Sequence, residues 1–91
     1  MPRTIQQTVQ DWHWDRHTII YAAIKYVVNN GGSVAQSNLV NHITPMSNDP
    51  EGAVRSMCSS SGNNYGDVFV NNNGIISINP SWANEIRKYQ W

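Results

Sequence analysis

Apolar residues recur at helical spacing in several stretches of the chain and alternate at strand spacing near its end. The longest helical stripe ends near Asn29. Residues 30–32, Asn-Gly-Gly, follow it and can supply the positive φ of a helix C-cap. Asp11 or Asp15 is expected to cap the start of this first helix. Its stripe consists of Ile19, Ile20, Ala23, Ile24, Val27 and Val28.

A second, shorter helix is expected up to the Thr-Pro pair at 44–45, because proline disfavours helix in the residue before it. Residues 33–35, ahead of this helix, allow two interpretations. They can form a short strand, with the helix starting near Gln36, or Ser33 and Gln36 can form a capping box. The two preceding glycines favour the strand. The stripe of the second helix consists of Leu39, Val40 and Ile43.

The segment from Asn48 to Ser61 predicts a third helix with a polar outer face. Asn48 or Asp49 can cap it, and Pro50 suits its first turn. Its apolar stripe is Ala53, Val54, Met57 and Cys58, and its outer face is Glu51, Arg55, Ser56, Ser59 and Gly62. The outer face is either the solvated back of a short amphipathic helix or a surface for a DNA groove. Two short helices with a tight connection are typical of a helix-turn-helix.

A β-hairpin is expected next, because β-rich residues 67–71 and 75–78 flank an Asn-Gly pair at 73–74. The expected partners are Asn72 with Ile75, Asn71 with Ile76, and Phe69 with Ile78. Phe69, Ile76 and Ile78 then share one face, which should pack on the helices. Asn79 and Pro80 should start a last helix running to about Tyr89.

The length and the net charge of the chain exclude several classes of protein. Ninety-one residues suit one domain, residues 1–91, in which residues 1–10 have no clear period and form an N-terminal arm. The formal net charge is zero, which argues against an indiscriminate nucleic-acid coat protein and against a membrane-surface helix. The chain has neither an apolar run of membrane length nor a signal peptide, so a cytoplasmic protein is expected. Cys58, the only cysteine, should be a buried thiol.

Candidate catalytic and metal chemistry is sparse. His13 and His17 are four residues apart near Asp11 and Asp15, which could suit a divalent ion, but no third ligand is placed by spacing. Residues 85–88, Glu-Ile-Arg-Lys, superficially resemble a nuclease motif, but no strand carries them. We therefore expect neither an enzyme nor a cofactor, and the tryptophans are expected mainly as packing residues.

The predicted order of helix, short strand, helix, helix, hairpin and helix resembles a winged helix-turn-helix domain of the α+β class. The likeness spans about Arg16 to Tyr89. At residue level it is similar to small winged-helix modules attached to restriction endonucleases and bacterial regulators. The segments that carry it are Asn48-Asp49-Pro50-Glu51-x-x-Val54-Arg55, Val68-Phe69-Val70 and Gly74-Ile75-Ile76-Ser77-Ile78.

The resemblance implies that the third helix enters the major groove of duplex DNA and that the hairpin, or wing, contacts the backbone or minor groove. The implied DNA-binding residues are Arg55, Ser56, Ser59 and Ser60 on the helix, Asn63, Asn64 and Tyr65 in the following loop, and Asn71, Asn72 and Asn73 on the wing. The chain departs from the family in charge, because its wing has no Lys or Arg. DNA recognition within a larger restriction or regulatory system is therefore expected, with a parent chain, partner protein or homodimer supplying more contacts. The alternative is a protein-interaction module, such as a phage-encoded inhibitor or a subunit adaptor.

Overall fold

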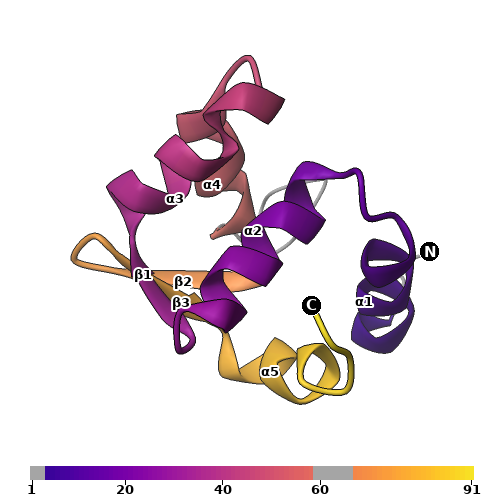
Figure 1. Cartoon of the computed structure of the whole chain (residues 1–91). Helices are drawn as coiled ribbons and strands as arrows, with labels where there is room; N and C mark the ends of the chain where they lie inside the picture. Colours follow the sequence, from indigo (N-terminus) through magenta and orange to yellow (C-terminus); the bar gives the residue numbers. More distant parts are fainter. Residues whose placement is uncertain (1–3, 59–66) are drawn as a thin grey trace.

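The computed structural model describes residues 4–58 and 67–91 and has an α+β fold. The helices in these ranges are α1 (Ile5–Trp14), α2 (Ile19–Asn29), α3 (Gln36–Ile43), the 3-10 turn η1 (Thr44–Met46), α4 (Pro50–Met57) and α5 (Pro80–Ile86). The strands are β1 (Ser33–Ala35), β2 (Phe69–Asn72) and β3 (Ile75–Ile78). Figure 1 shows α3 and α4 on one side of the strands, with α5 on the other side and α1 beside it.

Residues 5–14 form a helix where an arm was expected. The Thr4 hydroxyl accepts a hydrogen bond from the Gln7 N–H at 3.1 Å and so caps the first turn. Val9 is completely buried in the core. The helical period is carried by only three apolar residues, Ile5, Val9 and Trp12, among polar neighbours. The helix is therefore stabilised by its packing against the core more than by the helical propensity of its own sequence.

The long helix α2 is capped by Thr18, so the expected caps Asp11 and Asp15 were wrong. The Thr18 hydroxyl accepts from the Tyr21 N–H at 3.2 Å. Asp11 lies within α1, and Asp15 is the residue that follows that helix. The helix therefore starts at Ile19, where the apolar stripe starts.

The C-terminal end of α2 confirms the glycine cap. Gly31 and Gly32 have φ values of +84° and +91°. Their N–H groups donate to the carbonyls of Val28 and Val27 at 3.3 and 2.9 Å, which is the pairing of a Schellman motif. The chain is thereby turned from α2 directly into β1.

The three strands form an antiparallel sheet in the order β1-β3-β2. The strand interpretation of residues 33–35 is confirmed, and α3 begins at Gln36. The hairpin has the expected register, with Phe69 opposite Ile78 and Asn72 opposite Ile75. The turn residues Asn73 and Gly74 both have positive φ, as a two-residue turn of this kind requires.

The core lies between the inner face of the sheet and the helices. Phe69 and Ile76 point into it with no exposed surface, whereas Ile78 is half-buried. The other completely buried residues are Val9, Ala23, Ile24, Val27, Leu39, Ile43, Val54, Met57, Val68 and Ile86. Across the described ranges, no helix is long and apolar enough to cross a lipid bilayer.

Aromatic side chains join the two ends of the described chain. Trp12 of α1 stacks on Trp82 of α5 with ring centroids 5.3 Å apart and planes 9° apart. Trp14 is not the packing residue that was expected of the tryptophans, because 78% of it is exposed. The last helix ends at Ile86, three residues before the expected end, and Tyr89 packs against the core from the tail after it.

Substitution of the turn glycine tests the hairpin. We expect Gly74→Ala to lower the free energy of unfolding by about 1–2 kcal/mol, because a Cβ is disfavoured at its φ of +88°. Urea unfolding followed by circular dichroism measures the change. Asn73→Gly is the matched control and should change stability by only a few tenths of a kcal/mol. Equal losses in both variants would contradict the turn geometry.

Candidate functional site

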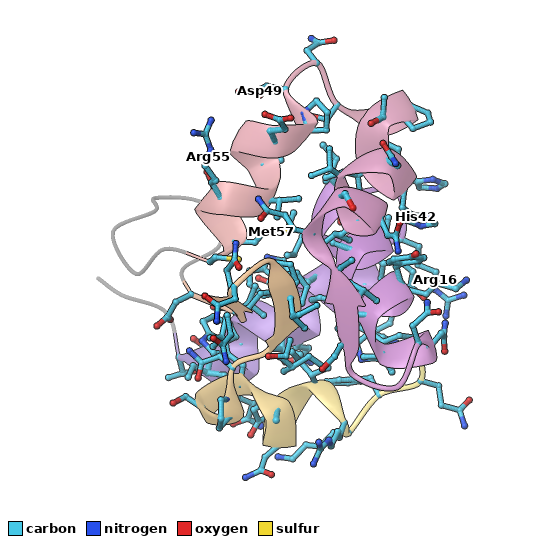
Figure 2. The ribbon with its side chains drawn as sticks, turned by 90° about the vertical axis from the view of Figure 1, so that its left-hand side faces the viewer. Arg16, His42, Asp49, Arg55 and Met57 are labelled. Carbon is cyan, nitrogen blue, oxygen red and sulfur yellow. The ribbon has the colours of Figure 1, made fainter. Side chains whose placement is uncertain are left out.

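Helix α4 carries the expected polar outer face. Asp49 caps the helix by accepting from the Gly52 N–H at 3.1 Å. Val54 and Met57 are completely buried, and this fixes the rotation of the helix about its axis. Arg55 is exposed, and in Figure 2 its side chain projects away from the body of the molecule. Ser56 is half-buried. The guanidinium is therefore available to a partner.

The charge on the exposed side of α4 is slightly negative. Asp49 and Glu51 are exposed carboxylates at its start, and Arg55 is its one basic residue. The two carboxylates favour the helix through its dipole, but they repel phosphate groups that approach its first turn. A partner on this side must therefore gain most of its binding energy from hydrogen bonds and shape.

A shallow groove of about 370 Å³ lies between α3 and the start of α4. It is lined by Gln36, Ser37, Val40, Asn41 and Glu51. Two amides and a hydroxyl there can both donate and accept hydrogen bonds. Sequence reasoning missed these residues of α3 because it assigned function only to the third helix. The available signal was the pair Ser37 and Asn41, which are four residues apart on the side of the helix away from Leu39.

Two hydrogen bonds tie the hairpin to the start of α3, and a third closes the turn of the hairpin. The Gln36 N–H donates to the Gly74 carbonyl at 2.8 Å. The Asn71 amide donates to Gln36 Oε1 at 3.0 Å, and Asn71 Oδ1 accepts from the Gly74 N–H at 2.9 Å. Asn71 therefore holds the hairpin in place, and the next two residues, Asn72 and Asn73, are exposed.

The predicted site residues are only partly brought together. Gln36 connects them, because it lines the groove with Glu51 of α4 and also contacts Asn71 of the hairpin. Arg55 and Ser56 lie on α4, and Asn71, Asn72 and Asn73 lie at the hairpin tip. The remaining expected residues lie outside the described ranges: Ser59, Ser60, Asn63, Asn64 and Tyr65.

The residues considered for metal and nuclease chemistry have other contacts. The His13 Nε2 lies 3.0 Å from the Gln90 carbonyl oxygen, and its ring stacks on Tyr89 at 4.6 Å. Among the residues that the structure describes, no group of three or more His, Cys, Asp or Glu side chains could hold a metal ion. Glu85 and Lys88 form an ion pair of 3.0 Å at the end of α5, not on a strand.

Cys58 follows α4 and is half-buried against the core rather than completely buried. Burial raises the pKa of its thiol, because the thiolate loses hydration. A raised pKa lowers the thiolate fraction near neutral pH, so the group is a poor nucleophile there.

No family model matches the chain, and no curated protein or solved structure is similar enough to it to count as a match. The function must therefore be argued from the surfaces of the molecule itself.

The tie between hairpin and α3 can be measured by a double-mutant cycle on Asn71→Ala and Gln36→Ala. We expect a coupling free energy of about 0.5 kcal/mol, because their hydrogen bond is exposed to water. Urea unfolding of the two single variants and the double variant gives this value. The pair Asn72→Ala and Gln36→Ala should give no coupling. Additive effects at Asn71 would contradict the tie.

The Cys58 thiol predicts a pH dependence. Because its pKa is raised by folding, the unfolded chain loses the thiol proton first as pH rises. Stability should be unaffected below the ordinary thiol pKa of about 8.5 and should fall above it, relative to Cys58→Ala. Denaturant unfolding of both proteins between neutral pH and pH 10 measures the difference. A difference that stays constant across this range would show that the thiol is solvated.

Proposed function

We propose that the chain is a winged-helix module that binds duplex DNA through α3, α4 and the hairpin. The order α2, β1, α3, α4, β2, β3 is the order of elements in that fold. In this arrangement α3 and α4 are the helix-turn-helix and α4 is the helix that enters the major groove. The pairing of β1 with β3 completes the three-stranded sheet below the wing.

The exposed Arg55 on a helix whose other side is locked into the core carries this proposal. A guanidinium can donate two hydrogen bonds to O6 and N7 of a guanine in the major groove. The amides of Gln36 and Asn41, which line the groove with Glu51, suit adenine, which presents one donor and one acceptor on the same edge. Asn72 and Asn73 would reach the DNA backbone from the hairpin tip.

The charge on the exposed side of α4 limits the affinity for DNA that this side can reach without other contacts. Each phosphate that a cation neutralises contributes about one unit to the salt dependence of binding, and α4 offers only Arg55 against Asp49 and Glu51. Non-specific affinity should therefore be low, and discrimination should come from hydrogen bonds to base edges. Such a module suits a larger restriction or regulatory assembly, or a homodimer, in which other parts hold the DNA.

A second candidate is a protein-interaction module, and the outer face of the sheet favours it. Val70 is 38% exposed and Ile75 is 47% exposed, and both side chains point away from the core. Together with Ala35, which pairs with Ile75, they give the sheet an apolar outer strip. Such a strip suits the apolar part of a protein interface.

Two substitutions on α4 with opposite effects test DNA binding. Arg55→Ala should weaken binding to a selected duplex by about tenfold or more, because it removes a base or phosphate contact. Glu51→Gln should strengthen binding by about two- to tenfold at low salt, because it removes a repulsive charge. Fluorescence anisotropy with duplexes selected from a random pool, methylated and unmethylated, measures both changes.

Arg16→Ala is the matched control, since Arg16 lies on the opposite side of the molecule in Figure 2. It should leave duplex affinity within about twofold. Absence of binding to any duplex, or equal losses in the Arg55 and Arg16 variants, would contradict the proposed surface. A Val70→Asp or Ile75→Asp variant that loses a protein complex would then favour the second candidate.

A further inference from the structure

Three adjoining hollows cover the side of the molecule that faces away from Arg55. Figure 2 shows Arg16 and His42 at the edge opposite to Arg55. The first hollow, about 420 Å³, lies between α2 and the region around η1, and the second, about 540 Å³, lies between α2 and the C-terminal tail. The third, about 360 Å³, lies at the end of α1. Arg16 lines all three, so they form one continuous surface, which we name the Arg16 face.

The Arg16 face is positively charged. Its lining includes Arg16, Lys25 and Lys88, and no Asp or Glu side chain lines any of the three hollows. Lys88 is partly neutralised by its ion pair with Glu85 at 3.0 Å. Arg16 and Lys25 are exposed and form no ion pair within the described residues. These two cations therefore attract an anionic partner to this side.

Most aromatic rings of the Arg16 face pack against one another. Tyr26 stacks on His42 at 4.4 Å. At the tail, the rings of Tyr21 and Trp91 are 5.2 Å apart, and the Trp91 indole donates to the Ile86 carbonyl at 2.7 Å. Few ring faces are thus left for stacking nucleobases, which single-stranded nucleic acid needs for tight binding. Neutralising two or three phosphates would add a salt slope of only about 2.

The composition of the Arg16 face is instead that of a protein interface. Aromatic residues, methionine and arginine are enriched in such interfaces, and acidic residues are depleted. Met46, which lines the first hollow, is 43% exposed, and Trp14, which lines the third, is 78% exposed. These two side chains can cover apolar groups of a partner, and Trp and Arg are frequent energetic anchors.

We propose that the Arg16 face binds an acidic segment of another protein. Carboxylates of the segment would pair with Arg16 and Lys25, and an apolar side chain between them would fill the hollow lined by Tyr26, His42 and Met46. The net negative charge at the start of α4 disfavours such a segment on the opposite side. This proposal does not depend on duplex binding, because it uses none of the residues assigned to DNA.

Selection from a random peptide library displayed on phage tests the proposal. The wild-type chain is the bait, and the double variant Arg16→Ala, Lys25→Ala is used for counter-selection. Both residues are exposed, so the variant should fold, and circular dichroism checks that it does. The retained peptides should be rich in Asp and Glu around one apolar residue. A synthetic peptide of that consensus should bind the double variant at least about tenfold more weakly than the wild type.

Three controls define the outcome. Arg55→Ala should bind the consensus peptide as the wild type does, and Trp14→Ala should bind it more weakly. Retained peptides without acidic residues, or no enrichment over the double variant, would overturn the proposal. A labelled oligothymidine that binds the wild type and is lost in the double variant would also overturn it, by assigning the face to single-stranded nucleic acid.

Discussion

The central strand β3 holds the two halves of the molecule together. It pairs with β1, which joins α2 to α3, and with β2, which follows α4 in the chain. Ile76 at its middle is completely buried opposite Val34 of β1. Because side chains alternate across a strand, a shift of one residue in either pairing would expose Ile76. The turn at Asn73 and Gly74 prevents that shift between β2 and β3, since only one register of the hairpin allows their positive φ values.

The same pairing positions the candidate DNA-binding surface. Because the register is fixed, the Gly74 carbonyl and the Asn71 side chain reach Gln36, and the hairpin is held against the start of α3. Helix α4 is fixed separately, by the burial of Val54 and Met57. The hairpin is thus bonded to α3, while α4, which packs against α3, presents Arg55. An arrangement held by backbone and core contacts can present polar groups without rearranging when a partner binds.

Sequence signals within a few residues predicted the turns, caps and strands that they determine, but they did not predict contacts between distant segments. The hairpin register, the strand at 33–35 and the glycine cap at 31–32 each follow from φ preferences within a few residues, and each was found. Helix α1 was missed because its apolar residues are few and its stability comes from contacts with α5, such as Trp12 on Trp82. The Arg16 face was missed for a similar reason, since α1, α2 and the tail contribute to it from distant parts of the chain. For the site, Arg55 was placed outward correctly, but the structural role of Asn71 depends on Gln36, which lies 35 residues earlier.

A formal net charge of zero hides an uneven distribution over the surface. The start of α4 carries Asp49 and Glu51, whereas Arg16 and Lys25 line the opposite face without an acidic neighbour in its hollows. Binding at α4 should therefore depend on the fit of hydrogen bonds and respond little to salt, because few counterions are released. Binding of an acidic segment at the Arg16 face should weaken as the salt concentration rises, since attraction between charges draws the partner there. An acidic segment is thus disfavoured at the start of α4 and attracted to the Arg16 face, so the local charges of a neutral chain can decide on which side such a partner binds.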